Sequence, residues 1–567
     1  MGAIDVLSRP LLLDDRLHDH DSVNPSLGCP SSSRFEEEGN STDMCVVDVQ
    51  DSGRSAVSSA NSKVKWWSAW EFKDLPPLPA SSPVDPFRNS SYKFGGAWEV
   101  FKAVLCSPLL VVRVILIGVF LFLGFLCTKL ALWRWESDHK AMPRWRRDIM
   151  WGTRVCARGI LFCFGFHWIQ RIGRPAPREV APILVSNHVS FIDPMFYFFE
   201  LFPTIVSSSS HNDRLFVGTI IRSMQVLGAT FDLINEITVW CVQVIPVDRL
   251  SPASRKSAIA EIKRRAMCSD FPRLLLFPEA TTTNGKALIS FKPGAFVPGF
   301  PIQPVVVRYP HVHFDLSWGN ISLKSLIPRM LLQFHNFMQV HYLPVIYPSS
   351  HEKSHPADYA QRVRYAMARS LNVPETEHSY GDLLLSARSL SLKMPFSTSF
   401  TLEMRKMDTQ LQLTDADALY YLEKFSIMNS SRSGQLTRFE FLQSLGLTHS
   451  PFGEQAFAMF DRKKHEFVTF QEFVAASVSL SRNASFLKLL DLTFCHAVHK
   501  NSNEMLLMDK VATLLERNCA GSTSKVLVDQ FCKQTDRMDH ATFCLYLKRN
   551  PELIFPLSLV ILSLNEE

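Results

Sequence analysis

The stretch that decides the fold is APILVS-NHVSFID, residues 181–193. Its first half is a short apolar run of the kind that forms a buried β-strand, and its second half is a polar turn that carries His188 and Asp193. Similar β-rich runs recur downstream, at 242–247, 273–277 and 302–308. Helical patterns separate these runs. Strands that alternate with helices predict an α/β domain whose chemistry lies at the strand ends.

The pair His188 and Asp193 is the clearest chemical signal in this stretch. A carboxylate beside an imidazole holds the ring in one tautomer and makes it a better base. Such a pair can take a proton from a hydroxyl that belongs to a substrate, so the protein needs no nucleophile of its own. The alternative is a structural His–Asp pair that only fixes the turn.

Three further segments place polar groups at the ends of predicted strands. Residues 277–285, FPEATTTNG, offer a carboxylate, three hydroxyl groups and a glycine-ended turn, and Arg249 offers a guanidinium fork that suits a phosphate. With residues 302–307, IQPVVV, and the His–Asp turn, these segments resemble the four blocks of the glycerophospholipid acyltransferase superfamily, the 1-acylglycerol-3-phosphate acyltransferase family. The order of the blocks is the same. The chain is most similar to the plant lysophosphatidylethanolamine and lysophosphatidylcholine acyltransferases with C-terminal EF-hands.

This resemblance implies acyl transfer from acyl-CoA to the free hydroxyl of a lysophospholipid. His188 would act as the general base on that hydroxyl, and Asp193 would orient the ring and stabilise the imidazolium. The residues implied to bind the substrate are Arg249, Glu279, Thr281, Gly285 and Pro304. Acyl-CoA is then the co-substrate, and no catalytic metal is needed because the thioester is already activated.

Two features depart from the family pattern. Ala280 stands where the third block usually has glycine. If the backbone there has a positive φ, the methyl group costs on the order of 1 kcal/mol. An additional segment, Val226–Gln243, also separates Gly218–Arg222 from the strand before Arg249. Because the segment is apolar and its ends resemble splice junctions, we interpret it as a retained intron or an alternative splice product, with a membrane-facing loop as the alternative.

A long apolar stretch precedes the α/β domain. Between Ala103 and Thr128 the only charged residue is Arg113. As a helix the stretch would span about 39 Å, more than the ~30 Å of a hydrocarbon core, which predicts a transmembrane or deeply inserted helix. Basic residues follow it and indicate a cytosolic side. A second apolar stretch, Gly159–Ile169, is too short to span and predicts an interfacial or re-entrant helix.

The charge distribution agrees with a membrane partner. The formal net charge is +6 although the N-terminal tail is acidic, so the rest of the chain is basic. A basic surface of this modest density favours an anionic membrane over nucleic acid. We therefore expect a membrane and the two lipid substrates as partners, and no nucleic acid.

Residues 429–440 have the spacing of an EF-hand calcium loop, with Gly434 at its sixth position. The expected ligands are Asn429, Ser431, Ser433 and Glu440. Tight sites use several carboxylates and this loop has one, so we expect weak Ca²⁺ binding at most. A second loop, 461–472, keeps both terminal carboxylates but has Lys463 at its third position, and a third, 499–510, ends in lysine. We favour a calcium-free structural or docking module.

The sequence thus divides into six parts. They are an acidic disordered tail (1–95), membrane-anchoring segments (96–175), an α/β acyltransferase domain (176–375), a linker (376–406), a degenerate EF-hand-like all-α module (407–550) and an apolar tail (551–567). We expect a location in the endoplasmic reticulum membrane, with the Golgi as the alternative, and a catalytic domain that faces the cytosol. The alternative functions are a glycerol-3-phosphate or lysophosphatidate acyltransferase and a catalytically inactive, membrane-anchored EF-hand adaptor.

Deletion of Val226–Gln243 tests the interpretation of the insert. The deletion joins Gln225 to Val244 and restores the family spacing before Arg249. The shortened protein should accumulate and transfer acyl groups at least as fast as the full chain, because an apolar segment that can shift the strand register has been removed. Transfer from labelled acyl-CoA in microsomes measures this. An inactive or unstable product would show that the segment is part of the fold.

Overall fold

The computed structural model describes residues 84–91, 96–134, 141–208, 245–247, 252–311, 314–319, 321–394, 400–447, 451–483, 486, 506–507, 537–538 and 540–555. The insert Val226–Gln243 and Arg249 lie outside these residues, as does most of the tail expected over 1–95.

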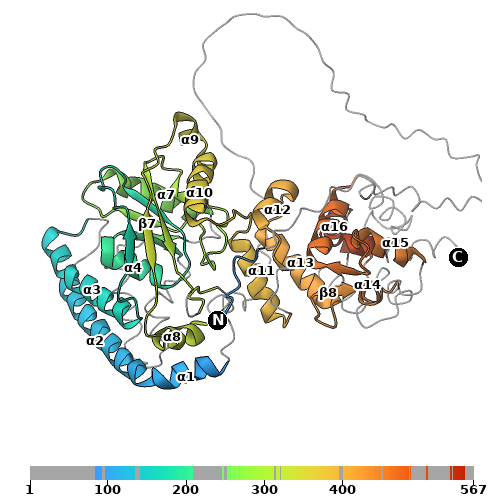
Figure 1. Cartoon of the computed structure of the whole chain (residues 1–567). Coiled ribbons are helices and arrows are strands. Elements are labelled where there is room, and N and C mark those ends of the chain that lie inside the picture. The colour runs from blue at the N-terminus through green and yellow to red at the C-terminus, as the bar shows by residue number, and fades with distance from the viewer. Residues whose placement is uncertain are drawn as a thin grey trace, which may run out of the picture. The chain divides into compact units, whose positions relative to one another are not determined.

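A mixed sheet forms the centre of the α/β domain (Figure 1), and in the described residues its strand order is β1-β7-β6-β2-β5-β3-β4. The strands are β1 (Gln170–Ile172), β2 (Ile183–Ser186), β3 (Thr204–Ser208), β4 (Ile245–Val247), β5 (Leu274–Leu276), β6 (Ile302–Arg308) and β7 (Gln339–Tyr342). Neighbours from β6 to β4 are parallel, β7 is antiparallel to β6, and β1 is parallel to β7. The carboxyl ends of β2, β5 and β6 therefore lie at one edge, where ligands bind in sheets of this kind. The predicted α/β class is confirmed.

Helices cover both faces of the sheet. The helices with residues in the two cores beside the sheet are α4 (Ile192–Leu201), α7 (Pro252–Met267), α8 (Leu323–Leu331) and α10 (Pro356–Leu371), with the short 3-10 helix η4 (Pro293–Ala295). The helix α9 (Ser350–Ser354) precedes α10, and α11 (Tyr380–Ser391) follows it and packs against α13 (Asp415–Met428). Alternate residues of each strand point to opposite faces. Leu184 of β2 therefore packs in one core with α4 and α8, whereas Ile183 and Val185 pack in a second core with α7 and α10. Both faces of the central strands are buried, as expected for parallel sheets.

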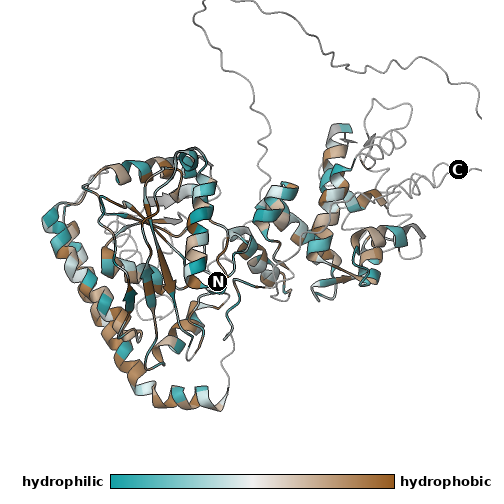
Figure 2. Ribbon diagram, turned by 45° about the horizontal axis from the view of Figure 1, so that its top comes forward, coloured by the Kyte–Doolittle hydropathy of each residue, from teal (hydrophilic) through white to brown (hydrophobic). Residues whose placement is uncertain are grey.

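The apolar stretch predicted to insert into a membrane forms α2 (Ser107–Leu132), preceded by α1 (Ala97–Leu105) and followed by α3 (Arg144–Cys163). Among the described helices, α2 alone is long and apolar enough to cross a membrane, by length and composition. Hydrophobic residues follow one another along it (Figure 2), and only 17% of its most apolar window is buried. It packs against α3, where the hydroxyls of Thr128 and Thr153 lie 3.2 Å apart.

Arg113, the one charged residue in the apolar stretch, is buried and joins α2 to the α/β domain. Its guanidinium donates to the carbonyl oxygens of Leu331, Gln333 and Phe334 at 2.7, 2.5 and 2.8 Å. These carbonyls lie at and just after the C-terminal end of α8, where the last turn of a helix lacks partners and a cation is favoured. The charge therefore serves as a C-terminal cap.

The second apolar stretch, Gly159–Ile169, does not form the expected interfacial helix. The helix α3 ends within it, at Cys163, and the chain turns at Gly165 with φ 87°. Phe164, Phe166 and Ile169 are buried in the core of the α/β domain. That prediction was wrong because hydropathy alone does not distinguish a lipid-facing segment from one that enters a protein core.

Residues 84–91, expected to belong to the disordered tail, form an ordered strap against the α/β domain. Asn89 is buried, and its amide donates to the carbonyl oxygens of Asp315 and Ser317 at 3.0 and 2.8 Å. Phe87 is also fully buried. The expected tail over 1–95 thus includes a segment that completes the domain.

Paired helices and short strands follow residue 400. They are α12 (Met404–Leu411), α13 (Asp415–Met428), β8 (Gln435–Thr437), α14 (Arg438–Ser444), α15 (Pro451–Phe460), β9 (Phe467–Thr469), α16 (Phe470–Arg482), β10 (Leu506–Leu507), β11 (Arg537–Met538), α20 (His540–Arg549) and the 3-10 helix η6 (Pro551–Leu553). The strands β8 and β9 are antiparallel, with Leu436 opposite Val468, and β10 pairs with β11 in the same way. Ile554 and Phe555, the last described residues, are buried.

Replacement of Arg113 tests the link between α2 and the domain. Arg113→Leu leaves three carbonyl groups without their donor, so we expect a loss of about 2–4 kcal/mol in stability and a fall of several degrees in Tm. Thermal unfolding in detergent micelles measures this. Lys129→Leu, which removes an exposed cation of the same helix, is the control. Equal effects of the two substitutions would contradict the capping role.

Candidate active site

The turn after β2 is held to the neighbouring strand β6 by Asn187. Its Nδ2 donates to the carbonyl oxygen of Val307 at 2.9 Å, and its Oδ1 accepts the Val307 N–H at 2.8 Å. The side chain therefore continues the backbone pairing after the strand has ended. This contact fixes the next residue, His188, at the carboxyl edge of the sheet.

His188 and Asp193, predicted as a pair, are joined by a hydrogen bond of 2.9 Å between Nδ1 and Oδ2. Asp193 is fully buried in the first turn of α4, and its Oδ2 also accepts the N–H groups of Val189 and Ser190 at 2.8 and 2.9 Å. A carboxylate at Nδ1 keeps the ring proton on that nitrogen and leaves Nε2 with a lone pair. The His188 side chain is 13% exposed, so the ring is not sealed from a substrate.

Tyr309 binds Oδ1, the other carboxylate oxygen of Asp193. Its part in the site was not predicted from the sequence. Its hydroxyl donates to Oδ1 at 2.5 Å. Burial and the neighbouring Asp193 charge raise the pKa of Tyr309 well above its ordinary value, so the phenol stays protonated and remains a donor. Its position directly after the strand over 302–308 was the available signal, because that end joins the edge that carries His188.

Phe277, the first residue after β5, lies against the imidazole. The rings of His188 and Phe277 are stacked with centroids 4.3 Å apart and planes 23° apart. An aromatic face attracts a cation, so this contact favours the ring when it carries a second proton. Tyr197 of α4 packs edge-on against the same phenylalanine, and its hydroxyl donates to Ser186 Oγ at 2.8 Å.

The loop after β5 turns at Ala280 with φ 58°, so the backbone there has the positive φ at which a methyl group carries a cost. Glu279 before it is buried, with 1% exposed, and its Oε2 lies 3.4 Å from the Thr283 hydroxyl. Burial raises the pKa of Glu279 well above its ordinary value, although the His188 backbone N–H and Thr283 act against this. The carboxyl group is thus favoured in its neutral form. Thr283 N–H also donates to the His188 carbonyl oxygen at 2.8 Å, so the loop and the turn that carries His188 are directly bonded.

Of the remaining residues expected to bind substrate, the structure describes three and leaves out Arg249. Gly285 has φ 71°, and a Cβ there would lie 3.3 Å from Val189 Cγ2, so the glycine lets the loop approach the turn. Thr281 is buried in the same loop. Pro304 is buried within β6, opposite Val185 of β2. Arg249 lies outside the described residues, although β4, which precedes it, runs parallel to the central strands.

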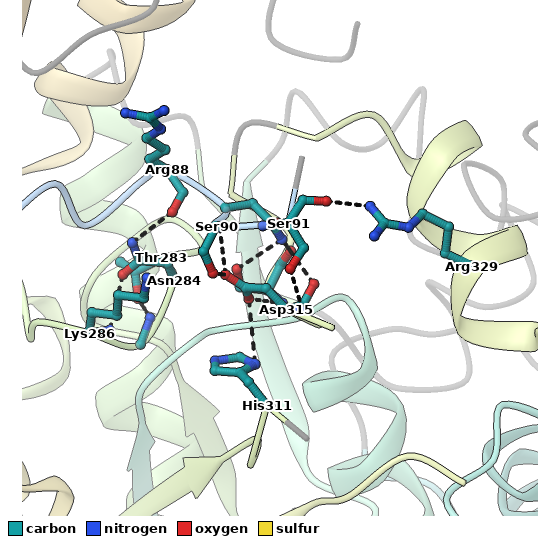
Figure 3. A network of polar contacts seen from close by, with 12 residues as sticks. Arg88, Ser90, Ser91, Thr283, Asn284, Lys286, His311, Asp315 and Arg329 are labelled. Carbon is teal, nitrogen blue, oxygen red and sulfur yellow. Dashed lines mark hydrogen bonds and ion pairs between the residues drawn. The ribbon is translucent and has the colours of Figure 1, made fainter. Parts of the chain in front are cut away.

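The strap lies over the loop after β5 (Figure 3), and Asn284 makes the contact. The amide Nδ2 of Asn284 donates to the carbonyl oxygens of Asp85 and Arg88 at 2.7 and 2.9 Å, and its N–H donates to Pro86 at 2.7 Å. On the other side of the strap, Asp315 accepts from Ser90 through the backbone N–H and the hydroxyl, at 2.9 and 2.7 Å. The N-terminal segment therefore supports the loop that holds Glu279.

Residues that could hold a metal ion occur in the described part of the chain. The residues expected to bind calcium, Asn429, Ser431, Ser433 and Glu440, lie in the loop between α13 and α14 and are hydrogen-bonded among themselves. His351, His355 and Asp358 form an exposed group on α9 and α10, with ligand atoms within 4.8 Å of one another. Neither cluster includes His188 or Asp193.

Known acyltransferases resemble this chain in sequence. The Acyltransferase family profile matches residues 171–308. The lysophospholipid acyltransferase LPEAT2 of Arabidopsis thaliana is 48% identical over 74% of this chain and 75% of its own length. The lysophosphatidylcholine acyltransferase 2 of Mus musculus is 32% identical over 68% and 69% of the two chains. Among solved structures, the 1-acyl-sn-glycerophosphate acyltransferase PlsC of Thermotoga maritima is 15% identical, with a TM-score of 0.32, and covers 48% of this chain and 96% of its own.

The profile match includes the His188–Asp193 turn, the loop after β5 and the strand β6, and the relatives extend the similarity over most of the chain. Acyltransferases of this family use acyl-CoA as co-substrate and no catalytic metal. This chain belongs to the lysophospholipid acyltransferase family.

Proposed function

We propose that this enzyme re-acylates the free hydroxyl of lysophosphatidylethanolamine or lysophosphatidylcholine by general-base catalysis at His188. The observation that supports it best is the hydrogen-bonded series Tyr309–Asp193–His188, which leaves Nε2 of the imidazole as the one ring nitrogen for a substrate hydroxyl. The names of the relatives support the substrate class.

In the proposed reaction, Nε2 takes the hydroxyl proton while the hydroxyl oxygen attacks the carbonyl carbon of the acyl-CoA thioester. A new C–O bond forms, the C–S bond breaks, and the thiolate of CoA leaves with the proton that the imidazolium returns. Asp193 stabilises the imidazolium between these two steps, and the stacked ring of Phe277 adds to this. The protein forms no covalent intermediate.

For substrate binding, we assign the phosphate to Arg249, because a guanidinium at the end of a parallel strand can bind it in a bidentate way. Thr281, Gly285 and Pro304 would shape the surrounding pocket. For Glu279 we propose a structural role. Since its carboxyl is buried and favoured neutral, it would hold the loop against the His188 turn, and not bind a charged headgroup directly.

We propose that the helices before the domain attach the protein to a membrane. Exposed apolar side chains are numerous there, including Trp98, Phe101, Ile115, Phe122 and Trp151. Since Arg113 ties one side of α2 to the domain, we propose that the other side is buried among lipid tails, next to the site that takes the lysophospholipid. The endoplasmic reticulum, or alternatively the Golgi, would supply this membrane, with the active site on the cytosolic side.

The helices after residue 400 would form an EF-hand-like module. The loops 429–440 and 461–472 lie side by side through β8 and β9, and position eight of one faces position eight of the other. This pairing supports the EF-hand relation. We propose a docking or structural role for the module.

The narrower alternatives are a lysophosphatidate or glycerol-3-phosphate acyltransferase and an inactive adaptor. Membranes that contain the protein, offered labelled acyl-CoA with each acceptor in turn, distinguish them. We expect the two lysophospholipids with a choline or ethanolamine headgroup to be acylated fastest. No transfer to any acceptor would favour the adaptor.

Removal of the base tests the mechanism. His188→Ala should lower kcat by at least 10²-fold, and Asp193→Asn should also lower it strongly, because the imidazolium loses its partner. Membrane association and Tm of His188→Ala should stay near those of the wild type. His355→Ala, which changes an exposed histidine, is the control and should retain full activity. Near-normal transfer by His188→Ala would exclude the proposed base.

The role of Tyr309 can be tested by removing its hydroxyl alone. Tyr309→Phe takes one donor from Asp193, so the carboxylate and the imidazole bonded to it are held less firmly. We expect kcat to fall by about tenfold while the KM values for both substrates change little. Tyr197→Phe, which removes a hydroxyl bonded to Ser186, is the matched control and should keep a kcat near that of the wild type. An unchanged kcat in Tyr309→Phe would show that the tyrosine has only a packing role.

A further inference from the structure

The amide group of Asn429 stands inside the first EF-hand-like loop as a hydrogen-bond donor. Its Nδ2 lies 2.6 Å from the carbonyl oxygen of Gln435 and 3.4 Å from both Ser433 Oγ and Glu440 Oε2. Its Oδ1 accepts the Gly434 N–H at 3.2 Å, so acceptors surround the nitrogen and a donor faces the oxygen. This environment determines which way the amide is turned.

The oxygens around this nitrogen are those that a calcium loop would turn toward its ion. Ser433, Gln435 and Glu440 occupy positions five, seven and twelve, which supply two side-chain ligands and one carbonyl ligand in an EF-hand. Here they accept hydrogen bonds from a neutral NH₂ group at position one. A donor of the chain therefore takes the place that an EF-hand reserves for a cation.

Glu440, the only carboxylate of the first loop, is satisfied by further donors. Its Oε1 accepts the Ser431 N–H at 2.8 Å and the Ser430 hydroxyl at 3.1 Å, and its Oε2 accepts the N–H and hydroxyl of Thr437 at 3.0 and 2.9 Å. The carboxylate is thus stabilised without a metal.

In the second loop, a lysine ammonium lies near the carboxylate at position twelve. Lys463, at position three, brings its ammonium to 3.9 Å from Oε1 of the buried Glu472 at position twelve. Asp461, at position one, is occupied by the N–H groups of His465 and Glu466 at 2.9 and 2.8 Å. Glu466 has φ 64° at the position that normally needs glycine. A positive charge of the chain thus offsets the carboxylate that would otherwise attract Ca²⁺.

We propose that the amide of Asn429 and the ammonium of Lys463 replace the two calcium ions of an EF-hand pair, so that the module is held in one conformation without metal and does not respond to Ca²⁺. The inference rests on the proposed EF-hand relation of the module and is independent of the chemistry at His188. In the first loop, calcium would have to displace the hydrogen bonds of Asn429, and it would gain only one carboxylate ligand. In the second loop, the positive charge of Lys463 would repel it. Acyl transfer is then equally fast with and without calcium.

The experiment uses the full chain in detergent micelles. Calcium titrated into the wild type should give no binding heat and no change in Tm, whether in excess Ca²⁺ or in EDTA. Asn429→Asp replaces the NH₂ group with an oxygen, which faces Glu440 without a donor between them. In EDTA its Tm should fall by several degrees because two carboxylates then repel each other. Calcium should bind with a measurable heat and restore the lost Tm.

Two further variants sharpen the test. Gln410→Glu makes the same exchange of amide for carboxylate on the exposed side of α12 and should show no response to calcium. Lys463→Asp should create a response at the second loop in the same way. The proposal is overturned if calcium binds the wild type and raises its Tm, or if Asn429→Asp accumulates but is neither weakened in EDTA nor restored by calcium. If Asn429→Asp does not accumulate, the wild-type titration and Lys463→Asp still decide the matter.

Discussion

The buried carboxylate of Asp193 is the interaction on which the site depends. It accepts hydrogen bonds from the imidazole of His188, from two backbone N–H groups of the turn and from the Tyr309 hydroxyl. These donors belong to the turn after β2 and to the end of β6, and the carboxylate itself begins α4. A buried charge is tolerated only when it is satisfied in this way. The same bonds that stabilise Asp193 therefore fix the imidazole of His188, the proposed base, relative to the sheet.

Arginine side chains that bind backbone carbonyls hold the helices before the domain to the rest of the fold. Arg113 of α2 binds carbonyls at the end of α8, and Arg146 of α3 binds those of Ala131 and Trp133 at the end of α2. Arg154, also of α3, donates to Phe199 and Glu200 near the end of α4, at 2.9 and 3.0 Å. Each places a cation at the negative end of a helix. Arg113 and Arg154 thus join α2 and α3 to the α/β domain, and Arg146 joins α3 to α2.

The sequence was sufficient for the features that depend on nearby residues. The α/β class follows from the alternation of strand and helix patterns and is confirmed. The closeness of His188 and Asp193 follows from their spacing in one turn, and the structure contains the hydrogen bond between them. Tyr309 was missed because its partner, Asp193, is distant in the chain and the contact depends on strand order. The strap was assigned to the disordered tail because its residues are mostly polar. The residues that order it, Asn284 and Asp315, lie roughly two hundred positions further along the chain, so local sequence gives no sign of the contact. The burial of Glu279 likewise depends on the surrounding fold.

The strap also determines where an N-terminally shortened form of the enzyme can begin. Hydropathy suggests a fragment that starts at α1 or at the sheet, since the residues before them look dispensable. Such a fragment would leave the Asn284 amide and the Asp315 carboxylate without the donors and acceptors that the strap provides, and would empty the space filled by Phe87. A unit with an intact loop beside His188 therefore includes the strap from at least Asp85 onward, ahead of α1, α2 and α3.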